Sequence, residues 1–419
     1  MTTPAFRVTR PWPIRMLNHA GRPLARIGAA PRLDTQHLRA AASRAAGLPW
    51  IPDDYLDTAL DVLVASLRDE AELSFLGRKM VQVRLVGMLS TRLRLRELIR
   101  KRPEIAELRV EPPIVIVGLQ RTGTTLLHRL LAADPAAGSM RSWEGAQPLP
   151  HPDEPTGAAH LRIAKAAKDE ASLRYLAPQF FAIHSVEAEA PEEDVLLLDF
   201  ALHSQMPEVM FHVPSYASWL AAQNMQPAYE LHRLLLQVLQ WQQPRGRWIL
   251  KTPAHLEHLD VLLRVYPDAV VVWTHRDPAQ TTASSSSMLA HYQALFSDHV
   301  DHHRLSRYWL GKNAQIIDRA ITVRDNHPES FVDINYPELL NDPMRSVQRI
   351  HDAAGRPLSD AAVAAMQTSL RTNRQHKHGE HRYSLEQFGL TTEEVDDAYQ
   401  RYVEHFSIER ESGGVRERL

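Results

Sequence analysis

The chain has 419 residues, of which 44% are hydrophobic and 23% are charged, a balance typical of soluble globular proteins. Forty-eight Lys and Arg residues against fifty Asp and Glu residues leave a net charge of −2, which argues against broad binding to nucleic acid. The absence of cysteine excludes disulfides, zinc–thiolate sites, iron–sulfur clusters and cysteine nucleophiles.

No stretch of the sequence is apolar over the roughly 20 residues that a membrane-spanning helix needs, so we expect no membrane span. Residues 1–32 are basic and interrupted by proline, and they lack the continuous apolar core of a secretory signal. We therefore predict a cytoplasmic protein. The sequence does not indicate an oligomeric state.

The first part of the chain has a helical pattern, because apolar residues recur at three-to-four-residue spacing over residues 34–105. It contains no catalytic constellation. We interpret residues 1–110 as an N-terminal helical extension that serves packing or oligomerisation. Residues 111–419 are predicted to form the functional domain, and the mostly helical insertion at 148–247 has a size suited to covering a substrate.

Continuous apolar runs predict buried parallel strands at residues 114–117, 248–250, 269–273 and 331–334. Helical patterns at residues 125–133 and 255–265 lie between them. Strands that alternate with helices indicate an α/β fold, and ligands of such sheets bind at the carboxyl ends of the strands.

A phosphate-binding loop is predicted at residues 118–125, which read GLQRTGTT between the first strand and its helix. Gly118 and Gly123 have the spacing of the nucleotide-triphosphate loop, but Thr124 stands where that loop has its lysine. Arg121 offers a forked contact to a phosphate or sulfonate instead. The predicted fold is therefore an α/β, P-loop-like parallel sheet flanked by helices, with an N-terminal helical extension.

Two other functions stay open at this point. A P-loop nucleotide kinase or ATPase would need a loop lysine and an acid that holds magnesium, for which Asp277 is available. A non-catalytic nucleotide-binding protein would make the polar residues near the loop incidental.

Residues 116–127 resemble the 5′-phosphosulfate loop of sulfotransferases that use 3′-phosphoadenosine-5′-phosphosulfate (PAPS). The motif style is most similar to the tyrosylprotein-type branch of that family, and the resemblance covers roughly residues 111–390. It implies that the 5′-phosphate and sulfonate of PAPS are held by the loop residues Arg121, Thr122, Gly123, Thr124 and Thr125.

A second stretch, from Val270 to Ser284, resembles the element of the same family that binds the 3′-phosphate. The resemblance implies contacts from Arg276 at a strand end and from Ser284 on the following helix, which can converge on one phosphate group. Tyr336 resembles a tyrosine that contacts the adenine, although Pro337 stands where the family has an acidic residue, and a buried structural tyrosine is the alternative. Residues 371–390 resemble a basic loop that closes over the cofactor, or form a solvated charged face.

Sulfonate transfer requires a base for the acceptor proton and a cation near the bridging oxygen. The resemblance implies that Lys251, at the end of the second predicted strand, contacts that oxygen. Glu144 is the favoured base, because several branches of the sulfotransferase family have a catalytic glutamate at about this position, after the helix that follows the phosphate loop. His255 is the alternative, since Pro253 occupies the position of the histidine in the cytosolic branch.

The predicted activity is metal-independent transfer of a sulfonate from PAPS to a hydroxyl of a small-molecule, lipid, glycolipid or other carbohydrate acceptor. Aromatic residues in the insertion, such as Phe180 and Trp219, suit a partly apolar acceptor. No metal site is predicted, because histidines such as His299, His302 and His303 match no familiar ligand motif.

Overall fold

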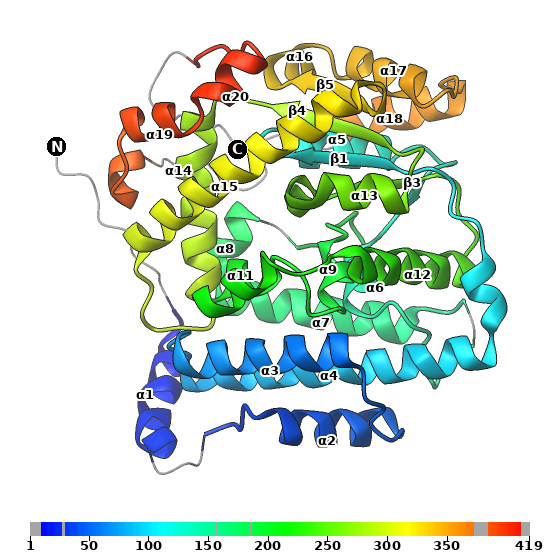
Figure 1. The fold of residues 1–419 in the computed structure, drawn as a ribbon. Helices are drawn as coiled ribbons and strands as arrows, with labels where there is room; N and C mark the ends of the chain where they lie inside the picture. The colour runs from blue at the N-terminus through cyan, green and yellow to red at the C-terminus, as the bar shows by residue number, and fades with distance from the viewer. Residues whose placement is uncertain (1–9, 27–29, 156, 185, 373–383, 412–419) are drawn as a thin grey trace.

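The fold is built on a five-stranded parallel sheet with strand order β2-β3-β1-β4-β5. Figure 1 labels β1, β3, β4 and β5. The computed structural model describes residues 10–26, 30–155, 157–184, 186–372 and 384–411. The strands are β1 (Ile114–Gly118), β2 (Gly138–Ser139), β3 (Trp248–Lys251), β4 (Val270–His275) and β5 (Phe331–Asn335). Four of them coincide with the predicted runs, and only the two-residue edge strand β2 was not predicted. The predicted P-loop-like α/β sheet is thus confirmed.

Side chains alternate along β1, so that both faces of the sheet are buried. Ile114 and Ile116 pack into one apolar cluster, whereas Val115 and Val117 pack into a second, larger one. The helices on the first face are α5 (Thr124–Leu131), α16 (Tyr336–Asn341), α17 (Pro343–Ala353) and α18 (Asp360–Thr372). The predicted helix at 125–133 therefore exists as α5.

The second face is covered by helices that come before β3, after β3, after β4 and, at the end of the chain, after β5 (Figure 1). They are α12 (Gln226–Gln242), η2 (Pro253–His258), α13 (Leu259–Val265), α14 (Pro278–Gln293), α15 (His302–Asn326), η4 (Leu385–Phe388), α19 (Thr392–Ala398) and α20 (Gln400–His405). The short turn η3 (Pro328–Ser330) leads into β5 and buries no residue. The predicted helix at 255–265 is divided between η2 and α13.

The N-terminal helices form a layer on the far side of the second cluster (Figure 1). They are α1 (Trp12–Arg26), α2 (Thr35–Ala46), α3 (Asp54–Asp69), α4 (Phe75–Lys101) and η1 (Pro103–Glu107). Leu60 and Leu89 of this layer belong to the same buried cluster as Trp248 of the sheet, so the extension shares its core with the rest of the protein. Among the described helices, none is both long and apolar enough to cross a membrane.

The middle of the chain between β2 and β3 is helical, as its composition indicates. It contains α6 (Ser142–Ala146), α7 (His160–Leu176), α8 (Pro178–Ile183), α9 (Val195–Asp199), α10 (Met206–Met210) and α11 (Pro214–Leu220), followed by α12. Residues 186–194 run between α8 and α9 and lead to the carboxyl end of β3, where Asp194 accepts a hydrogen bond from the Lys251 amide. This segment therefore belongs to the edge of the sheet at which ligands bind.

Candidate active site

The loop after β1 has a backbone that glycine makes possible. Gly118 and Gly123 have φ values of 151° and 92°, and a Cβ atom at Gly118 would lie 2.4 Å from Thr274 Oγ1. Arg121 also has a positive φ of 72°, a conformation that costs a non-glycine residue about 1–3 kcal/mol. A strained arginine in such a loop points to a functional position.

The loop leaves the first amides of α5 open. Gly123 is the N-cap residue and carries no side chain that could accept a hydrogen bond from them. These amides and the helix dipole favour an anion at this place. The Thr122 hydroxyl instead donates to the Leu119 carbonyl at 2.7 Å and lies 2.6 Å from Thr274 Oγ1, so it braces the loop against β4. At the start of α5, Thr124 is buried and Thr125 is exposed.

Arg276 follows β4 directly and joins the two predicted cofactor elements. Its Nη1 atom donates to the Arg121 carbonyl at 2.9 Å, across 155 positions of sequence. The contact follows from the topology, because β1 and β4 are parallel neighbours and Gly118 is opposite Thr274. The Arg276 guanidinium also lies 4.1 Å from the centre of the Tyr336 ring, which begins α16 after β5.

Tyr336 therefore lies beside the loop, as well as beside Arg276. A Cβ atom on Gly123 would come within 3.0 Å of the Tyr336 ring. Ser284, the partner predicted for Arg276 in holding a 3′-phosphate, lies on α14 and is fully buried. The structure thus brings Arg121, Gly123, Arg276 and Tyr336 together at the carboxyl ends of β1, β4 and β5.

The Arg276 guanidinium forms an ion pair with a carboxylate from the C-terminal segment, that of Glu411. Glu411 Oε1 and Oε2 accept from Arg276 Nε and Nη2 at 2.7 and 3.1 Å, a forked geometry that phosphate shares. Asp277 is used differently, because its Oδ1 accepts from the Ala279 amide at 3.0 Å and caps α14. Its other oxygen accepts from the Glu411 amide at 3.0 Å. Both oxygens of Asp277 therefore bind backbone amides. The kinase hypothesis would instead require this carboxylate to hold magnesium.

Lys251 ends β3, next to β1 in the sheet, and its side chain is almost fully buried. Its ammonium donates to Glu193 Oε1 at 2.8 Å, and the hydroxyl of Thr252 donates to Glu193 Oε2 at 3.2 Å. Burial and the nearby charge of Lys251 lower the pKa of His128 to about 3, so this imidazole on α5 stays neutral. Sequence reasoning missed Glu193, although a run of three acids before the apolar helix α9 was a signal.

Glu144 is fully buried in α6 and is paired with Arg245. Its Oε2 accepts from Arg245 Nη1 and from the Arg141 amide, both at 2.9 Å, while Oε1 accepts from Arg245 Nη2. Arg245 precedes β3, so this ion pair and Lys251 are at opposite ends of that strand. A catalytic role of Glu144 remains a prediction.

His255 is also fully buried, in a hydrogen-bonded chain of side chains. Its Nε2 lies 2.7 Å from Asp194 Oδ2, and its Nδ1 lies 2.9 Å from the Tyr229 hydroxyl. Burial raises the pKa of Tyr229 well above its usual value, so the hydroxyl keeps its proton. Both ring nitrogens of His255 are therefore engaged, and its role as a base stays a prediction.

His232 completes this chain from the other side of Asp194. Its Nε2 lies 2.9 Å from Asp194 Oδ2 and its Nδ1 lies 2.9 Å from the Tyr266 hydroxyl. Burial lowers the pKa of His232, which keeps the ring neutral. Burial alone would raise the pKa of Asp194, but its interactions with His255 and His232 hold that pKa well below the usual range.

The ligand atoms of Asp194, His232 and His255 lie within 4.8 Å of one another, which raises the question of a metal ion. A tetrahedral zinc at about 2.0–2.2 Å from each ligand would hold neighbouring ligand atoms roughly 3.3 Å apart. The observed separations of 2.7 and 2.9 Å are those of direct hydrogen bonds. This cluster is therefore a hydrogen-bonded network.

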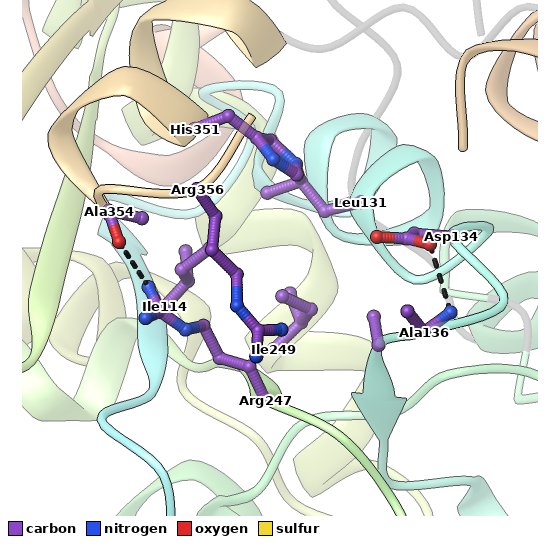
Figure 2. Close-up of a pocket in the computed structure, with 10 residues that line it drawn as sticks. Ile114, Leu131, Asp134, Ala136, Arg247, Ile249, His351, Ala354 and Arg356 are labelled. Atoms are coloured by element: carbon purple, nitrogen blue, oxygen red, sulfur yellow. Dashed lines mark hydrogen bonds between the residues drawn. The ribbon is translucent and has the colours of Figure 1, made fainter. Parts of the chain in front are cut away.

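A small cavity lies at the opposite edge of the sheet, where β1 and β3 begin (Figure 2). Arg247, His351 and Arg356 line it, and Arg247 donates to the carbonyl of Ala354 at the end of α17 at 3.0 Å. Basic side chains at this position complement the negative end of a helix dipole. Because the cavity lies where β1 and β3 begin, it is separate from the loop after β1.

Comparison with known proteins identifies the family. The model of the sulfotransferase family matches residues 112–360, more than half of the chain. The chain belongs to the sulfotransferase family. The match contains all five strands, the loop of Arg121 and the residues Glu193, Lys251, Arg276 and Tyr336.

Solved sulfotransferase structures are similar over almost the whole length. Sulfotransferase STF1 of Mycobacterium tuberculosis is 34% identical, with a TM-score of 0.76, covering 87% of this chain and 98% of that one. Sulfotransferase STF9 of Mycobacterium avium is 28% identical, with a TM-score of 0.82, covering 91% and 99%. A curated relative, the omega-hydroxy-beta-dihydromenaquinone-9 sulfotransferase Stf3 of Mycobacterium bovis, is 24% identical over 70% of this chain and 75% of its own.

Most of one sequence-predicted element, the basic loop at 371–390, falls at residues 373–383, which lie outside the described residues. Its closure over a cofactor therefore stays a prediction.

Proposed function

We propose that this sulfotransferase takes its sulfonate from PAPS and transfers it to a hydroxyl of an apolar small molecule or lipid. The contact of 2.9 Å between Arg276 and the Arg121 carbonyl carries the proposal, because it makes two anion-binding elements adjacent. PAPS has anionic groups on both the 3′ and the 5′ side of one nucleoside. ATP carries all its phosphates on one side and would leave Arg276 without a phosphate partner.

The residues present fit such a ligand. The forked pair between Arg276 and Glu411 indicates that this guanidinium accepts an anion in the geometry that a 3′-phosphate requires. The open amides at the start of α5 suit the 5′-phosphosulfate, and the Tyr336 ring beside Gly123 and Arg276 suits an adenine between the two anionic groups. Binding of the 3′-phosphate would replace Glu411 at Arg276.

Bound PAPS supplies an activated sulfonate. Lys251 would then neutralise the charge that develops on the bridging oxygen, with help from the loop amides and Arg121. These are fixed donors of the chain itself, and we propose that they stabilise the leaving group without a metal ion. The buried position of Lys251 strengthens its electrostatic effect.

The proposed acceptor class rests on the surroundings of Glu193. The Phe180 and Tyr292 rings stack with centroids 4.6 Å apart, and burial together with the charges of nearby acids, including Glu193, raises the pKa of Tyr292. Stacked aromatic rings within electrostatic range of Glu193 suit an apolar molecule with one hydroxyl. The Mycobacterium bovis relative is an omega-hydroxy-beta-dihydromenaquinone-9 sulfotransferase by name, which agrees with a hydroxylated, apolar acceptor. The cytoplasm is the proposed location.

The proposal is tested by calorimetric titration of the full chain with adenosine 3′,5′-bisphosphate and with ATP, each with and without magnesium. We expect the bisphosphate to bind at least about tenfold more tightly, because only it engages Arg276 in a charged hydrogen bond. Magnesium should leave its affinity unchanged. Tighter binding of ATP that depends on magnesium would instead favour a kinase or ATPase.

A further inference from the structure

Both bases suggested by the sequence, Glu144 and His255, are fully buried, whereas a third candidate, Glu193, has surroundings of a different kind. Glu144 is fully buried, and its two carboxylate oxygens accept three hydrogen bonds, two of them from Arg245. Glu193 has a side chain that is 25% exposed. A base must reach the proton of an incoming acceptor, so accessibility favours Glu193.

Glu193 is also next to the cation that the transfer needs. Its Oε1 lies 2.8 Å from Lys251 Nζ, and its Oε2 lies 3.2 Å from Thr252 Oγ1. An ammonium has three N–H donors, so Lys251 can hold Glu193 and still donate to a leaving oxygen. A base and an electrophilic donor in contact with each other define the point where acceptor and sulfonate meet.

The backbone at Glu193 is fixed by its neighbour. Asp194 Oδ1 accepts from the Lys251 amide at 2.8 Å, while its Oδ2 is held by the two histidines of the buried network. The peptide that carries Glu193 is thereby attached to the end of β3. This attachment is what places a side chain from the helical insertion beside Lys251, and Asp194 acts as a positioning residue.

We propose that Glu193 is the base that removes the proton from the acceptor hydroxyl, a role that rests on the proposed sulfonate transfer. As the acceptor oxygen forms its bond to sulfur, the bond between sulfur and the bridging oxygen breaks and the bridging oxygen keeps the electron pair. The acceptor proton passes to the Glu193 carboxylate. Lys251 stabilises the negative charge on the departing bisphosphate. Glu144 then has a structural role in its pair with Arg245.

The test compares Glu193→Gln with Glu144→Gln, the variant at the other candidate base, and with Glu104→Gln, an exposed control that should leave kcat unchanged. Transfer from labelled PAPS is measured with two acceptors, the isoprenoid alcohol farnesol and the phenol 4-methylumbelliferone. Glu193→Gln should lower kcat by about 10²–10⁴-fold, the usual effect of removing a general base. The loss should be smaller with the phenol, because its more acidic hydroxyl needs less help to lose its proton. Binding of adenosine 3′,5′-bisphosphate should not weaken, since the amide oxygen still accepts from Lys251 and a negative charge is removed.

Chemical rescue separates a base from a merely structural carboxylate. Glu193→Ala should regain part of its kcat when formate is added, because the small carboxylate can occupy the space that the side chain leaves. Glu144→Gln should keep kcat within about threefold per folded molecule and lower the thermal midpoint instead. Wild-type kcat in Glu193→Gln, or loss of kcat only in Glu144→Gln, would overturn the proposal. If the wild-type protein neither transferred sulfonate nor bound adenosine 3′,5′-bisphosphate, the result would instead count against the proposed function.

Discussion

Lys251→Met is expected to lower kcat for sulfonate transfer by about 10²–10³-fold, the effect of removing one donor that stabilises developing charge. Methionine keeps an unbranched stem in this buried position and removes only the ammonium. Since the charge on the bridging oxygen appears during the reaction, the loss should fall mainly on kcat. Steady-state kinetics with labelled PAPS, alongside calorimetry with adenosine 3′,5′-bisphosphate, gives both quantities.

A suitable control for this variant is Lys101→Met, which removes an exposed lysine at the end of α4. It should leave kcat and bisphosphate affinity unchanged. If Lys251→Met weakened bisphosphate binding as much as it lowered kcat, Lys251 would be a binding residue with no special task in the transition state.

Asp194→Asn is expected to destabilise the protein by about 3–5 kcal/mol, as when a buried charged network loses one partner. The carboxylate accepts from the Lys251 amide and from the Nε2 atoms of His232 and His255. An asparagine replaces one of the accepting oxygens with an NH₂ group, which would face a donor. Urea denaturation at neutral pH measures the free energy of unfolding.

The stability difference between the wild-type protein and Asp194→Asn should also depend on pH. The folded-state pKa of Asp194 is held well below its usual value, so its contribution to stability is present above the unfolded pKa of about 4. That contribution is lost as the pH falls through the depressed folded value. The difference between wild type and Asp194→Asn should therefore narrow below about pH 4. The exposed control Asp268→Asn should stay within about 0.5 kcal/mol of wild type, and a similarly small change in Asp194→Asn would contradict the importance of the network.

The sheet could be predicted because its strands are continuous apolar runs that end in a change of pattern. Ile114, Val115, Ile116 and Val117 show this most clearly, and the structure buries all four. The edge strand β2 has only two residues, Gly138 and Ser139, which is too short to carry a periodic signal. Its pairing with β3 is a property of the assembled sheet.

The candidate site was only partly within reach of the sequence. Arg121 and Arg276 lie in motifs that each follow a buried strand, so their position at the same edge of the sheet could be predicted. Their direct contact could not, because it depends on β1 and β4 being neighbours in the sheet. Glu144 was favoured because several branches of the family have a glutamate at about this position. No local pattern reveals that Arg245, 101 positions away, pairs with it. Glu193 meets Lys251 across 58 positions and follows no familiar motif.

The most direct test of the account is the affinity of Arg276→Ala for adenosine 3′,5′-bisphosphate and for adenosine 5′-phosphosulfate, which lacks the 3′-phosphate. A charged hydrogen bond is worth about 1.5–3 kcal/mol, so we expect bisphosphate affinity to fall by about 10–150-fold. Affinity for adenosine 5′-phosphosulfate should barely change, and the exposed control Arg264→Ala should affect neither ligand. An equal loss for both ligands in Arg276→Ala would contradict the assignment of the 3′-phosphate to Arg276, and with it the placement of PAPS across the two elements.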